Sequence, residues 1–205
     1  PPADDPSSVV IRRGPNIKPI PKKGSIENDL SGDVLIKLKD NISTDHILPA
    51  GTVTLALRSN IPAISEYVFS YIDPEFLSRA KKAGKGFIIA GHNYGQGSSR
   101  EHAALCPSYL GIQVVLAKSF ARIHKDNLIN YGVMPITFTD EFNYDELGMG
   151  NKLNINNIAQ SLKTDKTQIN VINTTNGQKI ECDLDVTRRQ REILLVGGLL
   201  NHVGV

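Results

Sequence analysis

The sequence is poor in cysteine, and this scarcity limits both its redox chemistry and its metal chemistry. Among 205 residues it has two cysteines, Cys106 and Cys182, which lie far apart and match no metal-ligand spacing. A disulfide framework is not expected, and a reducing compartment is favoured. A cluster held by thiolates needs three or four of them, so this chain alone cannot bind one. We interpret both cysteines as small buried apolar side chains.

Long apolar runs are also absent. No run reaches the roughly 18 residues that predict a membrane span. The first residues are rich in Pro, Asp, Ser and Arg, whereas a secretory signal contains an apolar segment. The formal net charge is only +2, and no basic stripe with interleaved aromatics is present, so RNA is not the expected partner. We expect no membrane partner and a cytoplasmic location, or the mitochondrial matrix in a eukaryote.

The first thirty residues differ in composition from the rest. They contain much of the proline, mixed with Lys and Arg, and lack helical periodicity. This pattern predicts an extended linker or arm over residues 1–30, followed by one domain over residues 31–205. The chain begins with Pro1 and not with Met, so we expect a piece of a longer protein.

The central part of the chain alternates short apolar runs with helical patterns. Alternation of this kind predicts βαβ units with parallel strands and right-handed crossovers. We expect strands at 34–38, 87–91, 112–117 and 134–138. We expect helices at 62–83 with an internal break at Asp73-Pro74, from Ser98 to Pro107, and at 120–131.

The tail of the chain has a different pattern. Two apolar runs, 168–173 and 178–186, flank Asn176-Gly177, which is a strong hairpin signal. Thr187 is a candidate cap for a last helix. The fold class is therefore predicted to be α/β, with parallel central strands and an added antiparallel layer.

The most informative stretch is GHNYGQGSSREHA, residues 91–103. Its glycines permit a tight turn, and a helix that begins with Ser98, Ser99 and Arg100 offers free N–H groups and a guanidinium to a carboxylate or phosphate. The alternative is a capping box, with Ser98 as N-cap and Glu101 three residues later. Spacing alone leaves both interpretations open. The stretch matches no P-loop, dinucleotide fingerprint or serine-hydrolase elbow.

A second cluster of polar residues lies upstream in DNISTDHILPAG, residues 40–51. Asp45-His46 could be an acid/base pair, a metal pair or a turn cap. Arg58 follows in LRSN, where a lone arginine is often a surface or ion-pair residue.

Four motifs together resemble the C-terminal swivelling domain of aconitases, in the family's order and over roughly residues 33–140. They are TDHILPAG, LRSN, GHNYGQGSSREHAAL and KSFARIHKDNLINYG. The resemblance implies a swivelling β/β/α three-layer domain. It also implies a role in aconitate hydration, in which citrate becomes isocitrate through cis-aconitate. The proline-rich arm resembles the linker to the cluster-bearing part of a single-chain aconitase.

The resemblance also implies roles for individual residues. Ser98 would be the base that takes and returns the carbon-bound proton, and Asp45 would help to position groups in the active site. Substrate carboxylates would contact Arg58, Ser99 and Arg100, and His46 is a further candidate in the same motif. The 4Fe-4S cluster would be bound by other domains, so we expect the isolated chain to be inactive. We assign no direct role to His92, His102, Lys118, Arg122 or His124.

Three hypotheses follow. The first is an aconitase domain excised from a longer chain, which the arm, TDHILPAG and LRSN favour. The second is a free-standing small subunit of a two-chain dehydratase such as isopropylmalate dehydratase. The third is a non-catalytic module that binds an anion or RNA.

Overall fold

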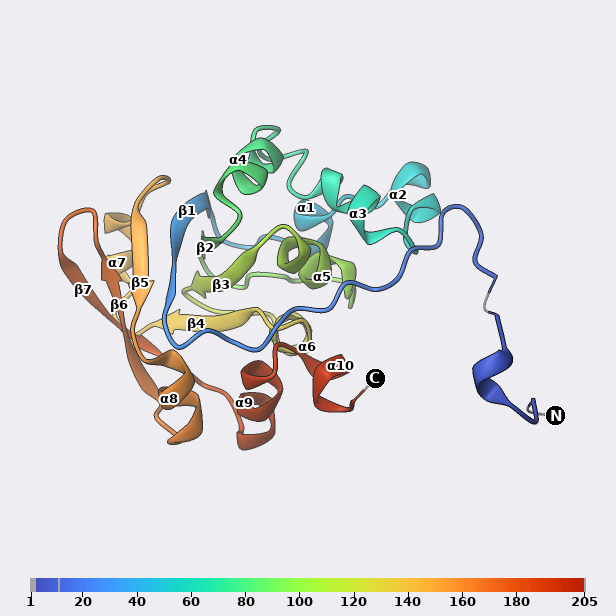
Figure 1. The fold of residues 1–205 in the computed structure, drawn as a ribbon. Helices are drawn as coiled ribbons and strands as arrows, with labels where there is room; N and C mark the ends of the chain where they lie inside the picture. Colours follow the sequence, from blue (N-terminus) through green and yellow to red (C-terminus); the bar gives the residue numbers. More distant parts are fainter. Residues whose placement is uncertain (1–2, 11, 205) are drawn as a thin grey trace.

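The centre of the molecule is a closed sheet. The computed structural model describes residues 3–10 and 12–204. Within them, the strands close into a barrel in the order β1-β2-β3-β4-β7-β6-β5 (Figure 1). The strands are β1 (Leu30–Leu38), β2 (Gly86–Ala90), β3 (Ile112–Ala117), β4 (Met134–Phe138), β5 (Lys152–Ile155), β6 (Gln168–Asn173) and β7 (Gln178–Asp183).

The barrel has a parallel half and an antiparallel half. Strands β1 to β4 pair in parallel, whereas β4–β7, β7–β6, β6–β5 and β5–β1 pair antiparallel. Every residue of β2 and β3 is buried, as expected for parallel strands that are covered on both faces. In β6 burial alternates, so one face of the antiparallel half is directed to the core.

Helices cover the barrel on two sides. In Figure 1, α1 to α4 lie above the parallel strands, and α8, α9 and α10 lie below them. The helices are α1 (Thr44–Ile47), α2 (Thr52–Ala56), α3 (Ile61–Ile64), α4 (Phe76–Ala83), α5 (His102–Tyr109), α6 (Arg122–Asn130), α7 (Phe142–Glu146), α8 (Ile158–Lys163), α9 (Arg188–Leu195) and α10 (Leu199–His202), with 3-10 turns at Pro6–Ser8 and Ser65–Tyr67.

The apolar core consists of two clusters that share strands. One lies under the helices on the outer face of the parallel strands and contains Ile88, Phe69 and Phe76. The other contains Ile89 of the same strand together with Val171 of the antiparallel half. Ile88 and Ile89 are directed to different clusters because successive side chains of a strand lie on opposite faces.

The predicted mixed α/β class is confirmed, with strands at 112–117 and 134–138 and a hairpin of β6 and β7. The expected three-layer arrangement is not confirmed. Strand β1 pairs with β2 on one side and with β5 on the other, so the antiparallel strands join the parallel ones in one closed sheet. The expected helix at 62–83 has the predicted break at Asp73-Pro74, but the break is wider than predicted, since helical structure already ends at Tyr67 and resumes only at Phe76.

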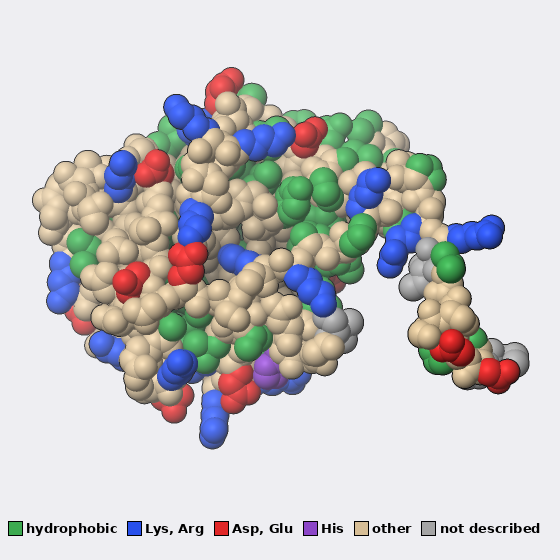
Figure 2. Space-filling view, in the orientation of Figure 1, with side chains coloured by type: hydrophobic (Ala, Val, Ile, Leu, Met, Phe, Trp, Pro, Cys, Tyr) green, Lys and Arg blue, Asp and Glu red, His purple; other side chains and the backbone are tan. Residues whose placement is uncertain are grey.

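The N-terminal arm has two parts. Its start projects from the body of the molecule (Figure 2). Closer to β1 the arm packs on the body: Lys23 Nζ donates to the carbonyl oxygens of Gly132 and Ile112 at 2.9 and 3.1 Å, and Ile26 N donates to Leu195 O at 3.1 Å. Part of the arm therefore contacts the domain before residue 30, and the boundary at that residue stays a prediction.

Candidate functional site

Three loops meet where parallel strands β1, β2 and β3 end. Gly95 N donates to Ile42 O at 2.7 Å, and Thr44 N donates to Gln96 O at 2.9 Å. Tyr94 N donates to Ser119 O at 3.0 Å, which brings in the loop after β3. Because the carboxyl ends of parallel strands share one edge of a sheet, segments far apart in the sequence lie side by side here.

Glycine at two positions gives the loop after β2 its shape. Gly95 and Gly97 have φ of 84° and 101°, in the left-handed region that favours glycine. Gly95 also lies directly against His124, because a β-carbon at position 95 would be 2.1 Å from the imidazole ring. Residues 95–100, which we call the serine loop, therefore lie close to α6.

The helix expected from Ser98 to Pro107 begins later and continues through Pro107 to Tyr109, and the alternative of a capping box at Ser98 is wrong. Helix α5 begins at His102, its N-cap is Glu101, and no side chain caps it. The backbone before it is held elsewhere, since Thr44 Oγ1 donates to Ser98 O at 3.1 Å. Ser98 and Ser99 are exposed, and their hydroxyl groups have no hydrogen-bond partner in the described part of the chain. Neither hydroxyl group forms a helix-capping hydrogen bond.

Arg100 and Asp45 form an ion pair across the two predicted motifs. Arg100 Nη1 donates to Asp45 Oδ1 at 2.5 Å, and it lies 3.4 Å from the carbonyl oxygen of Leu48. Both side chains are partly exposed. The pair holds one edge of the guanidinium near the serine loop and leaves its other donors available to an anion.

His46 has a local structural role. Ser43 N donates to His46 Nδ1 and His46 N donates to Ser43 Oγ, both at 3.1 Å, which is a reciprocal cap of α1. Of the three interpretations left open for Asp45-His46, the geometry of His46 supports the turn cap. The described residues contain no group of three His, Cys, Asp or Glu side chains that could hold a metal ion.

Arg58 lies just beyond α2 and is exposed. Its carbonyl oxygen is 2.8 Å from Nε2 of His102, the first residue of α5. The structure thus brings Ser98, Ser99, Arg100 and Asp45 together, and it connects Arg58 to the same region only through the backbone.

A pocket of about 200 Å³ lies between the serine loop and the first two turns of α6. Its lining includes Ser98, Ser99 and Arg100 of the serine loop and His124 and Asn127 of α6. Sequence reasoning assigned no role to the two α6 residues. Their spacing of three positions, which places both on one face of a helix, was the available signal.

Burial controls the charge of the groups beneath the loop. Desolvation lowers the pKa of His124 to about 4, so its imidazole is neutral at pH 7. Burial also raises the pKa of the Tyr94 phenol. The positive charge near the pocket therefore belongs to arginines and not to the histidine.

The two cysteines do not fit an iron–sulfur cluster. Cys106 of α5 and Cys182 of β7 are buried in different core clusters. Burial raises the pKa of each thiol to about 12, whereas a cluster is held by thiolates. The donors of this chain therefore do not form a cluster site.

Comparison with known proteins connects these features to a family. The family model of the aconitase C-terminal domain matches residues 72–141. The 3-isopropylmalate dehydratase small subunit 2 of Archaeoglobus fulgidus is 37% identical over 167 residues, which are 82% of this chain and 90% of that protein. A solved structure of 3-isopropylmalate dehydratase from Methanocaldococcus jannaschii is similar, with a TM-score of 0.70 and 32% identity; the match covers 85% of this chain and 93% of that one.

Longer relatives match as well. The mitochondrial homocitrate dehydratase of Saccharomyces cerevisiae is 32% identical over 97% of this chain. A putative mitochondrial aconitate hydratase of Emericella nidulans is 36% identical over 76% of it. The chain spans only 29% and 18% of the lengths of these two proteins.

Proposed function

The chain belongs to the aconitase and isopropylmalate dehydratase family, and we propose that it is the small subunit of a two-chain dehydratase of the isopropylmalate type. Members of this family are hydro-lyases. The observation that carries the proposal is similarity: the Archaeoglobus small subunit is 37% identical over 82% of this chain, and the solved isopropylmalate dehydratase structure matches 85% of it with a TM-score of 0.70. We expected an aconitase domain from the motifs and the arm, but the similar small subunit and solved structure support the small-subunit alternative better.

In this proposal Ser98 is the base. Its hydroxyl is exposed at the serine loop and free of helix capping. A serine takes a proton from carbon only when its alkoxide is stabilised, and fixed N–H groups and guanidinium groups provide that stabilisation in a site closed to water. Arg100 is the cationic residue nearest to Ser98 in the sequence. Ser99 can donate a further hydrogen bond to substrate.

The substrate class is a hydroxy acid with at least two carboxylates. Arg100 presents a planar fork that can bind one carboxylate bidentately, while Asp45 fixes the orientation of the fork. Arg58 would bind a second carboxylate, since it is exposed and its backbone contacts the start of α5. The remaining walls of the site would come from a partner.

The partner would be a large, cluster-bearing subunit. Aconitase-family enzymes carry their iron–sulfur cluster in other domains, and the two buried thiols described above do not form such a site. We propose the same division of labour here, in which the partner holds the cluster and this chain brings the base and the carboxylate ligands. None of the helices in the described residues could cross a membrane. We propose the cytoplasm as the location, or the mitochondrial matrix in a eukaryote.

Reconstitution tests the proposal. The chain alone is expected to be inactive, and the chain mixed with a large subunit should hydrate an unsaturated dicarboxylic acid of the isopropylmalate type. Ser98→Ala should abolish turnover without loss of assembly. Ser78→Ala, an exposed serine of α4, is the matched control and should be fully active. Near-normal turnover by Ser98→Ala would contradict the assignment of the base. It would also revive the alternative of a non-catalytic module that binds an anion or RNA.

A second candidate is the swivelling domain of a single-chain aconitase-type enzyme. The specific observation in its favour is that the yeast homocitrate dehydratase matches 97% of this chain, so most of the proline-rich arm has a counterpart in a longer protein. The two candidates differ in substrate. Preference of the reconstituted enzyme for cis-aconitate over the isopropylmalate intermediate would support the second.

A further inference from the structure

Arg58, the proposed ligand of the second carboxylate, lies in a segment that packs weakly on the rest of the molecule. Helix α2, which ends just before it, has five residues, and of these Thr54 is the one that is buried. Val53 and Leu55 of the same helix are 56% and 60% exposed. A helix this short is marginal without tertiary packing. The position of Arg58 must therefore be fixed by contacts from other segments.

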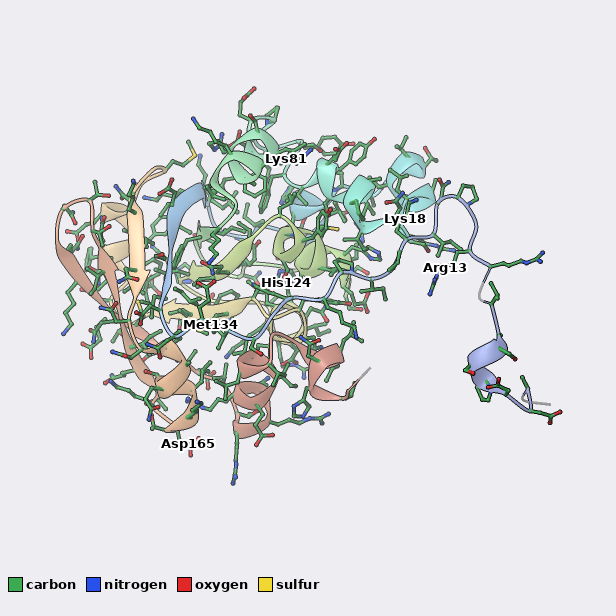
Figure 3. The ribbon with its side chains drawn as sticks, in the orientation of Figure 1. Arg13, Lys18, Lys81, His124, Met134 and Asp165 are labelled. Carbon is green, nitrogen blue, oxygen red and sulfur yellow. The ribbon has the colours of Figure 1, made fainter. Side chains whose placement is uncertain are left out.

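Two consecutive carbonyl groups receive such contacts. Arg58 O lies 2.8 Å from Nε2 of His102, and Ser59 O accepts a hydrogen bond from the backbone N–H of Lys18 at 2.9 Å. A carbonyl oxygen can only accept, so Nε2 of His102 carries the hydrogen. Lys18 belongs to the N-terminal arm, which passes α2 and α3 in Figure 3. We call these two hydrogen bonds the carbonyl contacts.

The arm that brings Lys18 to this place is stiff and is attached at a second point. Pro19 and Pro21 fix their own φ and favour extended backbone in the residues before them. At Lys23 the arm is attached to the body through the side-chain hydrogen bonds described above, and Asn201 Nδ2 donates to Lys23 O at 2.7 Å. An extended segment of this length spans about 15 Å. The arm therefore holds the Lys18 N–H at a defined distance from its anchor at Lys23.

The contact from His102 also relates the two proposed carboxylate ligands to each other. His102 is the first residue of α5 and lies two positions after Arg100, where the serine loop leads into that helix. Its hydrogen bond to Arg58 O therefore joins the main chain of one arginine to the segment that carries the other. A substrate with two carboxylates binds well only when both guanidinium groups are held at a matching separation.

We propose that His102 and the main chain of Lys18 are positioning residues for Arg58. They contact only its main chain and that of its neighbour, and they hold the loop so that its guanidinium keeps a fixed place relative to Arg100. The positioning role rests on the proposed function of Arg58 as a carboxylate ligand. The effect of the carbonyl contacts on the order of the loop does not, since it is a property of the chain alone.

Hydrogen exchange of the isolated chain tests the carbonyl contacts. Deletion of residues 1–18 removes the Lys18 donor and retains the anchor at Lys23, and His102→Leu removes the other donor. Each change should make the amides of residues 57–60 exchange about fivefold faster, because each removes one hydrogen bond that keeps the loop closed. Deletion of residues 1–13, which retains Lys18, is the matched control and should change nothing. Unchanged exchange in either variant would overturn the role of the residue that it removes, whether or not the chain is part of a dehydratase.

Kinetics of the enzyme assembled with its large subunit test the positioning role. His102→Leu should raise KM about 5- to 10-fold with kcat changed less than about threefold, because a mobile Arg58 weakens substrate binding more than the chemical step. His102→Gln retains an N–H donor and should restore most of the affinity. His202→Leu, at a histidine of α10, is the control and should leave KM unchanged. A loss confined to kcat, or equal KM values for the Leu and Gln variants of His102, would contradict positioning through Arg58.

A double-mutant cycle separates positioning from a general effect on packing. In an Arg58→Ala background, neither His102→Leu nor the deletion of residues 1–18 should raise KM further, because both act through the side chain that is missing. Additive effects would sink the positioning role. Absence of activity in the wild-type assembled enzyme with every dicarboxylic substrate would contradict the proposed function and the positioning role with it, while the hydrogen-exchange result would still decide whether the carbonyl contacts order the loop.

Discussion

Arg100 Nη1 lies 2.5 Å from Asp45 Oδ1, although the two residues are 55 positions apart in the sequence. The pair joins the segment after β1 to the serine loop after β2. Its side chains are 29% and 57% exposed, and ion pairs at such exposure contribute little to stability. We therefore propose that the pair serves mainly to orient the guanidinium of Arg100.

Arg100→Lys should reduce activity while leaving stability almost unchanged. A lysine keeps the charge but loses the planar fork that binds a carboxylate bidentately. Losing a charge-assisted hydrogen bond costs about 1.5–3 kcal/mol, so kcat/KM of the assembled enzyme should fall roughly 10- to 100-fold. Arg188→Lys, at an exposed arginine of α9, is the control and should have no effect. Full activity of Arg100→Lys would show that bidentate binding is not needed.

Gly95→Ala should damage the serine loop by steric contact with His124. The new β-carbon would lie 2.1 Å from the ring at a φ of 84°, so both clash and backbone strain are expected. Gly177→Ala separates the two effects, because Gly177 has a φ of 79° but nothing within 4 Å of its β-carbon position. Both variants should lose about 1 kcal/mol from the strained backbone. A further loss of stability, together with loss of turnover, is expected only for Gly95→Ala. Urea unfolding would measure the loss of stability, and activity assays of the assembled enzyme would measure the loss of turnover.

His124 should make the protein sensitive to acid. Its pKa is about 4 in the folded state and about 6.5 in the unfolded chain. Between these values the unfolded state binds a proton that the folded state does not, so the free energy of unfolding falls as pH falls from 6.5 to 4. The total loss from this group is on the order of 3 kcal/mol. Urea titrations over this range should show that the free energy of unfolding depends less steeply on pH in His124→Gln than in the wild-type chain. Equal pH dependence would refute the assignment of this acid sensitivity to His124.

Arg191 should be a major source of stability remote from the site. Its side chain is buried on α9 and donates to the carbonyl oxygens of Val186, Ser161 and Lys166. Arg191→Met leaves these carbonyls without their partner and should cost about 3–5 kcal/mol in urea unfolding. Arg189→Met, at an exposed neighbour, should change stability by less than about 0.5 kcal/mol. Similar values for the two variants would contradict this role.

The sequence predicted the individual helices and strands better than the closure of the strands into a barrel. Buried strands such as 112–117, and the Thr187 cap of α9, follow from local patterns and are present. The four-residue strand β5 was missed because its pattern is too short to distinguish from a loop, and without it a closed sheet could not be foreseen.

Only part of the candidate site could be predicted, because local sequence patterns do not report tertiary contacts. The Ser98–Glu101 spacing fits a capping box, but tertiary hydrogen bonds from Thr44 hold the serine loop outside the helix. The burial of His124 and Asn127 arises from packing of α6 against that loop, which no local pattern encodes.

The order in which the barrel is closed has a consequence for synthesis on the ribosome. Strands β1 to β4 are complete by residue 138, but β1 and β4 remain the open edges of a sheet until β5, β6 and β7 have emerged. Open edges pair readily with other chains. Nascent or truncated chains that end between residues 138 and 183 should therefore be the form most prone to aggregation and most dependent on chaperones.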